Sequence, residues 1–287
     1  MRFRIPLVLA GAVGGVACGR AICRRLPARQ WERQHRDGSS VSLFGGLETA
    51  TGTLGAAAVF ASAPIAQASL ITSLTGGVAG WVDDHLESRF PAVGKGFKGH
   101  LGALCRGKLT SGMLKIILIG AGSAASALIL QQQGKPCQQL HKDKSTQFLS
   151  TLFDAGLDTV IVAGTANLLN LLDLRPGRAL KSGILLSLPA LFSPDRTQQA
   201  LSLGLITTAL CELPDDLSGE KMLGDLGANA YGGAIGALLA AQTNKKHLPK
   251  STLATVIVAM TLASEKVSFS QVIESTPVLR ELDQLGR

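Results

Sequence analysis

The longest stretch without a charged side chain limits what this chain can fold into. Positions 49–82, a run of 34 residues between Glu48 and Asp83, contain no ionisable side chain. A single soluble helix of that length is implausible, because a surface helix needs one face that water can solvate. Two short membrane-spanning helices, hinged near Pro64, fit the run better.

Further uncharged runs follow the same pattern along the chain. They cover 5–19, 116–134, 155–172 apart from Asp158, 182–194, 197–211, 226–244 and 251–264. Several are shorter than the roughly 20 residues that cross a bilayer comfortably, but their many glycines suit close helix packing in lipid. We therefore expect an all-α, polytopic integral membrane protein with about nine transmembrane helices, formed by a single domain, 1–287.

The first uncharged run has an alternative interpretation as a cleaved signal peptide, because Arg2 and Arg4 precede it. Cys18 raises the further alternative of a lipoprotein. Gly15, at the third position before Cys18, is not the leucine expected in a lipoprotein signal. Because so many spans follow, a retained first helix is the favoured interpretation.

The basic residues are unevenly distributed between the expected loops. The chain has a net charge of +8, from 28 Lys and Arg against 20 Asp and Glu. With 24–47 in the cytoplasm, nine spans place 17 Lys and Arg on the cytoplasmic side and 9 on the other, in the direction of the positive-inside rule. The charge therefore indicates membrane orientation. No nucleic-acid partner is expected, because the sequence has no basic stretch interleaved with aromatic residues and no helix-turn-helix or zinc-finger motif.

Four polar clusters lie at the ends of expected spans, all on the cytoplasmic side of this topology, where the active site is expected. The first is the loop 31–46, which ends in Gly45-Gly46, and the second contains the adjacent carboxylates Asp83 and Asp84. Neighbouring carboxylates repel each other unless a cation or a proton neutralises them. Magnesium takes oxygen ligands, commonly one or two carboxylates together with substrate phosphates. Each cluster alone also fits a solvated loop or helix end.

The third cluster combines amides, a carboxylate and cations. Asn167, Asn170 and Asp173 are three residues apart and share one face of a helix. Three basic residues follow, among them Arg175 and Lys181. Hydrogen bonds between helices would explain the two asparagines, and the positive-inside rule would explain the basic residues. Neither explains why they occur together with Asp173.

The fourth cluster is 220–233, in which Asp225 lies between two glycines at the start of a span. This arrangement places a carboxylate beside the unpaired backbone N–H groups of a helix start, which bind phosphate. A capping role for Asp225 is the structural alternative. Together the four clusters have the composition of a site for a nucleotide diphosphate and a metal.

In this order, the clusters resemble the motifs of the polyprenyl-phosphate N-acetylhexosamine-1-phosphate transferase superfamily. That superfamily includes the phospho-MurNAc-pentapeptide translocase and the GlcNAc-1-phosphate transferases, and the resemblance covers about 30–275. The matching positions are Gly45-Gly46 for its first conserved loop, Asp83-Asp84 for its aspartate pair, Lys115 for a lysine downstream, Asn167, Asn170 and Asp173 for its N-x-x-N-x-x-D segment, and 224–227 for its G-D-x-G segment.

The resemblance implies a magnesium-dependent enzyme that transfers a sugar 1-phosphate from a UDP-sugar to a polyprenyl phosphate and releases UMP, in cell-envelope polysaccharide or glycolipid synthesis. It implies that Asp225 binds Mg²⁺ and that Asp83, Asp84 and Lys115 are catalytic. The residues implied for the nucleotide sugar are Gly45, Gly46, Asn167, Asn170, Asp173, Arg175 and Lys181. A multi-pass protein of the bacterial plasma membrane and a homodimer are further implications.

The chain also departs from that superfamily. Leu174 follows Asp173 where members often have glycine, and the histidine-rich loop of the translocase is missing. A catalytically inactive relative is therefore one alternative, and a small-molecule transporter is another. A transporter is expected to have internal repeats and charges at mid-membrane depth. No repeat is evident, and the carboxylates lie mostly at span ends, with Asp158 inside a span as the exception. A CDP-alcohol phosphotransferase is discounted, because its D-G-x-x-A-R motif does not occur.

Overall fold

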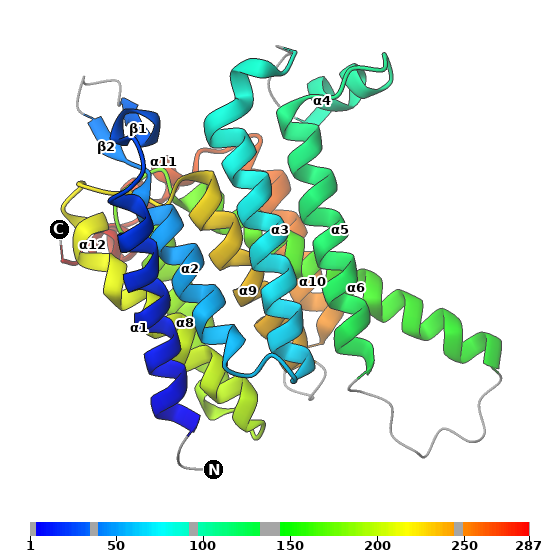
Figure 1. The fold of residues 1–287 in the computed structure, drawn as a ribbon. Coiled ribbons are helices and arrows are strands. Elements are labelled where there is room, and N and C mark those ends of the chain that lie inside the picture. Colours follow the sequence, from blue (N-terminus) through cyan, green and yellow to red (C-terminus); the bar gives the residue numbers. More distant parts are fainter. Residues whose placement is uncertain (1–3, 35–39, 92–96, 133–143, 244–248, 287) are drawn as a thin grey trace.

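Helices make up nearly all of the structure, as the uncharged runs predict (Figure 1). The computed structural model describes residues 4–34, 40–91, 97–132, 144–243 and 249–286. Its α-helices are α1 (Arg4–Cys23), α2 (Phe44–Ala58), α3 (Pro64–Leu86), α4 (Phe97–Leu104), α5 (Ser111–Gln131), α6 (Lys144–Leu172), α7 (Arg178–Ser187), α8 (Arg196–Leu217), α9 (Gly224–Thr243), α10 (Lys250–Ser264), α11 (Phe269–Ser275) and α12 (Pro277–Gln284). Two short strands, β1 (Glu32–Gln34) and β2 (Ser40–Ser42), pair antiparallel between α1 and α2.

Within the residues that the structure describes, four helical segments are long and apolar enough to cross a membrane. They are Ile5–Cys23, Pro64–Arg89, Ser111–Gln131 and Phe148–Leu172, and the count rises to five if α10 and α11, bent by 97°, form one broken span. The structure therefore agrees with a membrane protein but gives fewer candidate spans than the predicted nine. Of the other helices, α2, α7 and α10 are short, with 15, 10 and 15 residues.

Local sequence signals set several helix boundaries. Pro64 occupies the first turn of α3, where its missing N–H leaves no hydrogen bond unmade, so the predicted break in the long uncharged run is confirmed. The Thr110 side chain caps α5 by accepting a hydrogen bond from the Met113 N–H at 3.1 Å. The run 182–194 is not one continuous α-helix, because α7 ends at Ser187 and the 3-10 helix η4 (Leu188–Phe192) follows.

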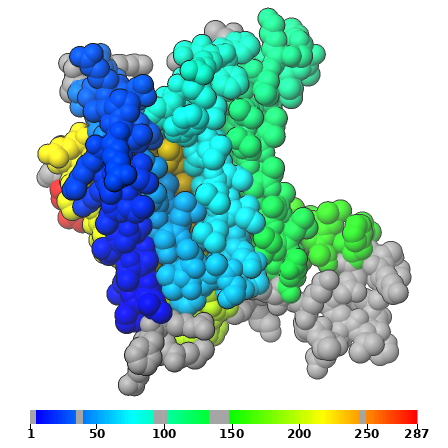
Figure 2. Space-filling model, in the orientation of Figure 1, coloured from blue at the N-terminus to red at the C-terminus, as the bar shows by residue number. Residues whose placement is uncertain are grey.

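The centre of the bundle is α9, a helix built almost entirely from small and apolar residues. Of its 20 residues, 16 are buried, and it packs against α2, α3 and α6. Figure 2 shows only a small gold area of it between the N-terminal helices. A helix that is apolar on all sides is stable only when other helices surround it, so α9 sets the position of its neighbours.

Glycines make the close packing of α3 against α9 geometrically feasible. A Cβ on Gly76 would lie 2.7 Å from the backbone carbonyl oxygen of Asn229, and one on Gly80 would overlap the backbone carbonyl of Asp225. Small residues four apart allow two helix backbones to approach closely. Because Gly80 lies just before the Asp83-Asp84 pair, this contact also brings the carboxylate ends of α3 and α9 together.

The first half of α6 departs from the bundle and projects away from it (Figures 1 and 2). Phe148, Leu149, Leu152 and Phe153 on this arm are 56–67% exposed. The second half of α6, in contrast, packs against α9 and carries Asp173 just beyond its end. One helix therefore joins an apolar surface to the polar end of the bundle.

Substituting Gly76 tests the packing of α9. We expect Gly76→Ala to lower the free energy of unfolding by about 1–3 kcal/mol, because overpacking a tight contact displaces backbone. Thermal unfolding in detergent measures the change. Gly120→Ala is the matched control, because a Cβ there meets no atom within 4 Å; equal stability of both variants would contradict the packing described.

Candidate functional site

One lysine joins two carboxylates from different helices at one end of the bundle. Lys115 is the fifth residue of α5, which the Thr110 cap begins. Its Nζ lies 2.6 Å from Asp225 Oδ2 at the start of α9 and 3.4 Å from Asp83 Oδ2 near the end of α3. Their side chains are between 14% and 22% exposed. The structure thus brings together three predicted site residues that are distant in the sequence, in a position that solvent reaches.

The two members of the Asp83-Asp84 pair have different surroundings. Asp84 is 1% exposed at its side chain, and its Oδ2 accepts a hydrogen bond from the Leu226 backbone N–H at 2.9 Å. This bond satisfies one of the unpaired N–H groups in the first turn of α9. Asp84 therefore caps α9 from a neighbouring helix, whereas Asp83 lies on the more exposed side with Lys115.

The β1–β2 hairpin supplies a cation that the sequence analysis did not single out. An Arg33 guanidinium nitrogen lies 3.1 Å from Asp84 Oδ1. The hairpin is fixed there by Trp31, which is buried and packs edge-on against His85 with ring centroids 4.4 Å apart. Arg33 belongs to the predicted loop 31–46, of which 35–39 lie outside the described residues. In the sequence, Arg33 is recognisable only as one member of a basic loop, and nothing there indicates Asp84 as its partner.

Asp173 forms the buried edge of the acidic group. Burial, and then the negative charge of Asp216, raise the pKa of Asp173 well above its usual range, while the backbone N–H of Gly224 lowers it. The negative charges of Asp225 and Asp84 raise the pKa of Asp173 further, by less than burial and Asp216 do. Asp173 Oδ2 is buried and has no hydrogen-bond partner among the described residues, and such an orphaned oxygen requires an explanation.

The donor chemistry of this group suits a magnesium ion. Asp83 and Asp225 already reach one cation, the Lys115 ammonium, and Asp173 adds a buried oxygen without a partner. Carboxylate oxygens are the ligands that Mg²⁺ prefers. The three carboxylates Asp83, Asp84 and Asp225 outnumber the two cations that contact them, Lys115 and Arg33, so a further positive charge would be stabilised there.

Gly45 and Gly46 serve close packing in this structure. A Cβ on Gly45 would lie 2.8 Å from the Met222 backbone oxygen, and one on Gly46 would overlap the Leu223 backbone oxygen. The start of α2 therefore lies directly on the segment that leads into α9. This segment also needs Gly224, whose φ of +58° is unfavourable for side chains with a Cβ. The predicted binding of nucleotide sugar by Gly45 and Gly46 stays a prediction.

The two asparagines of the third cluster lie on the expected helix. Asn167 and Asn170 are half-buried on the last turns of α6, which pack against α9. They precede Asp173 by six and three residues, so the predicted common helical face is retained. Their role toward a nucleotide stays a prediction.

The basic residues after Asp173 contact the last two helices. Arg175 pairs with Glu274 at 3.2 Å, and the Lys181 Nζ donates to the backbone carbonyls of Leu282, Asp283 and Leu285, the shortest bond being 2.7 Å. Between them, Arg178 makes two hydrogen bonds to Asp283, at 2.6 and 3.0 Å. These cations hold α11 and α12 on α7 and on the turn that precedes it. Nucleotide binding by Arg175 and Lys181 stays a prediction.

A pocket of about 300 Å³ lies between α7 and the last two helices. Its lining is mainly apolar, with Leu172, Ile184, Ile273 and Leu279 among the residues that form it. Arg178, Lys181 and Asp283 also line it, but Arg178 pairs with the Asp283 carboxylate and the Lys181 Nζ donates to the Asp283 carbonyl. The pocket therefore offers mainly apolar contacts, whereas a nucleotide diphosphate needs polar and positively charged ones.

Comparison with known proteins does not place the chain in a family. No family model matches it, and no curated protein matches it either. The functional assignment therefore rests on the residues that the helices bring together.

The Arg178–Asp283 pair gives a stability prediction for the last helices. Both side chains are at most 7% exposed, so Asp283→Ala leaves a buried positive charge without its partner and is expected to destabilise the docking of α12 by about 3–5 kcal/mol. Limited proteolysis within 269–286 measures the docking. Glu274→Ala is the control, because its pair with Arg175 is about half exposed and contributes less than about 1 kcal/mol. Similar protease sensitivity of the two variants would contradict a dominant role of Asp283.

Proposed function

We propose that this chain is a membrane enzyme that transfers a sugar 1-phosphate from a UDP-sugar to a polyprenyl phosphate. A phosphate oxygen of the acceptor forms a bond to the β-phosphorus of the donor, the bond from that phosphorus to the bridging oxygen breaks, and UMP leaves with this oxygen. The observation that carries the proposal is the Lys115 ammonium between Asp83 and Asp225. The order of the motifs along the chain supports the same chemistry.

Each residue of this group has a distinct proposed task. Lys115 neutralises charge on a substrate phosphate, because developing charge on phosphoryl oxygens must meet fixed positive groups. Asp83 and Asp225 would hold the magnesium ion, with Asp173 at the buried edge. When bound, Mg²⁺ supplies Lewis-acid stabilisation to the transferring phosphoryl group. Asp84 is engaged by Arg33 and the Leu226 N–H, so its task is to position α9.

The acceptor requires little help from a general base. A phosphate is already largely anionic near neutral pH, so the reaction depends little on removal of a proton by Asp83. Orientation of the two phosphates is then the main contribution of the protein. The close packing of α3 against α9 supports this interpretation, because rigid helices hold the charged groups at fixed separations.

We further propose about nine membrane crossings, with the acidic end of the bundle in the cytoplasm of a bacterial cell. The excess of Lys and Arg in the loops at that end supports this orientation. Helices outside the four candidate spans, such as α9, would cross inside a shell of more apolar helices. The homodimer implied by the resemblance is part of the same proposal.

The transporter alternative receives little support from Asp158. This carboxylate is fully buried, but it pairs with the Lys250 Nζ at 2.8 Å and accepts a hydrogen bond from Gln131 at 2.6 Å. Buried charges that pair with each other commonly join helices. We therefore assign this pair the role of connecting α5, α6 and α10.

Release of UMP tests the activity. Membranes that contain the protein, polyprenyl phosphate and Mg²⁺ are incubated with a panel of UDP-sugars, and UMP release is expected from at least one donor. Asp225→Asn is expected to lower turnover at least about 100-fold, because second-shell changes alone cost 10–100-fold and Asp225 is a proposed ligand. Asp154→Asn, an exposed carboxylate on the α6 arm, is the control. A folded protein that releases no UMP from any donor would support the inactive relative instead.

Cysteine labelling tests the orientation. Cys105 is exposed and lies in the segment 83–110, which the proposal places in the cytoplasm. A membrane-impermeant maleimide is expected to label it only after permeabilisation of spheroplasts. A variant that retains only Cys137, in the segment 132–150 assigned to the opposite side, should react without permeabilisation. The reverse pattern would overturn the orientation.

A further inference from the structure

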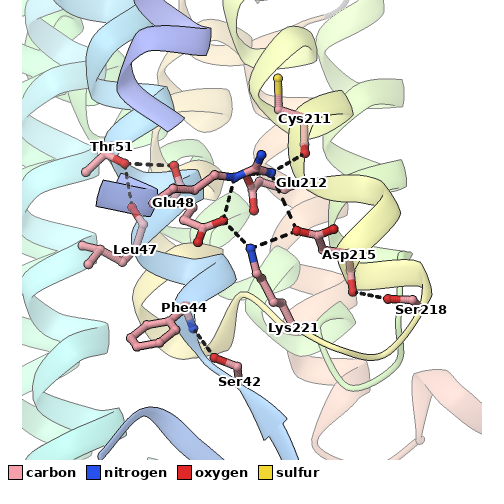
Figure 3. A network of polar contacts seen from close by, with 11 residues as sticks. Ser42, Phe44, Leu47, Glu48, Thr51, Cys211, Glu212, Asp215, Ser218 and Lys221 are labelled. Carbon is pink, nitrogen blue, oxygen red and sulfur yellow. Dashed lines mark hydrogen bonds and ion pairs between the residues drawn. The ribbon is translucent and has the colours of Figure 1, made fainter. Parts of the chain in front are cut away.

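Five charged side chains form a second network beside the site, and Figure 3 shows how they converge. Arg20 comes from α1, Glu48 from α2, Glu212 and Asp215 from the end of α8, and Lys221 from the segment between α8 and α9. The sequence analysis did not group them. A signal was present, because Arg20, Glu48 and Glu212 each border an uncharged run on the same predicted side.

Lys221 is the cation at the centre of this network. Its Nζ lies 2.7 Å from Glu48 Oε2 and 2.9 Å from Asp215 Oδ2. Oxygens of Glu48, Asp215 and Glu212 lie within 4.8 Å of one another, a spacing that would also suit a metal. Because the ammonium already contacts two of the three carboxylates, the protein supplies its own cation here.

The carboxylates around Lys221 are held by a second cation, Arg20. Glu48, which pairs with Lys221, and Glu212 beside it are 2% and 1% exposed, and Arg20 contacts both, at 3.3 and 3.2 Å. A buried carboxylate is strongly destabilised when its cation is removed. Burial tends to lower the pKa of Lys221, but the hydrogen bonds from its ammonium to Glu48 and Asp215 raise it above the usual value overall. The ammonium is therefore fully charged and held to α2 and α8.

The backbone around Lys221 is fixed as firmly as its side chain. The Lys221 N–H donates to the Asp215 carbonyl at 3.2 Å, the Ser42 N–H donates to the Glu220 carbonyl at 3.1 Å, and the Met222 N–H donates to the Ser42 carbonyl at 2.9 Å. Strand β2 thus pairs with this segment. The chain then reaches Asp225 within four residues of Lys221.

We propose that Lys221 is a positioning residue for Asp225, acting by clamping the segment 218–223 to α2 and α8. This inference rests on the proposed function for its catalytic consequence. The segment enters α9 through the left-handed turn at Gly224, so a shift at Lys221 is transmitted to the Asp225 carboxylate. Displacements near 1 Å far from the reacting atoms can lower rates about 100-fold.

Removing the ammonium tests the clamp. Lys221→Met is expected to speed amide hydrogen exchange across 218–226 and to raise the Mg²⁺ concentration for half-maximal UMP release about 10-fold or more, as outer partners of metal ligands do. Lys221→Arg restores the charge and should recover most of both properties. Asp215→Asn removes a more exposed partner, and offers a milder variant if Lys221→Met does not fold.

Lys250→Met is the matched control, because it also removes a lysine from a buried carboxylate. Its partner Asp158 lies on α6, and this pair connects α5, α6 and α10 instead of holding 218–223. This variant is expected to lower thermal stability without changing exchange at 218–226 or the Mg²⁺ requirement. The proposal is overturned if Lys221→Met retains wild-type exchange and Mg²⁺ requirement, or if Lys250→Met reproduces its changes. Absence of UMP release from the wild type would refute the proposed reaction alone, since amide exchange still reports on the clamp.

Discussion

The close contact of α9 with α3 is the constraint on which the rest of the structure depends. Glycine at positions 76 and 80 lets the two backbones approach until carbonyls of α9 lie where side chains would otherwise be. In lipid, where apolar side chains gain little by leaving the solvent, such van der Waals packing is a main source of helix association. The same contact places Asp83, Asp84 and Asp225 at one end of the bundle, so the arrangement of the candidate site depends on this helix packing.

The charged side chains at that end of the bundle form two neighbouring groups that differ in exposure. In the first, Lys115, Asp83 and Asp225 are 14–22% exposed, so a ligand can reach them. In the second, Arg20 and Lys221 contact the carboxylates, and Glu48 and Glu212 are only 1–2% exposed. Each group keeps one buried oxygen without a hydrogen-bond partner among the described residues, on Asp173 and on Glu212. We therefore assign binding to the first group because of its accessibility, and support to the second.

Much of the fold could be predicted from the sequence because its signals are local. The uncharged runs, the proline at position 64 and the glycines near Asp225 each act within a few residues. The gathering of Asp83, Asp84, Asp173 and Asp225 also followed from placing span ends on one side. The partners of Arg33, Arg175 and Lys181 could not be predicted, because a long cationic side chain reaches any carboxylate or carbonyl oxygen that tertiary packing brings near. The number of crossings is equally hard to predict from single segments, because a central helix such as α9 is shielded by its neighbours and can be built from small residues.

The projecting half of α6 has a practical consequence for handling the protein outside its native membrane. Phe148 and Phe153 extend the apolar surface beyond the bundle, so the solubilised particle is not a simple cylinder. A micelle or nanodisc belt sized for the bundle would leave this arm in water. Particles would then associate through this exposed arm. Their apparent mass would depend on the detergent or nanodisc chosen as much as on the protein's own oligomeric state.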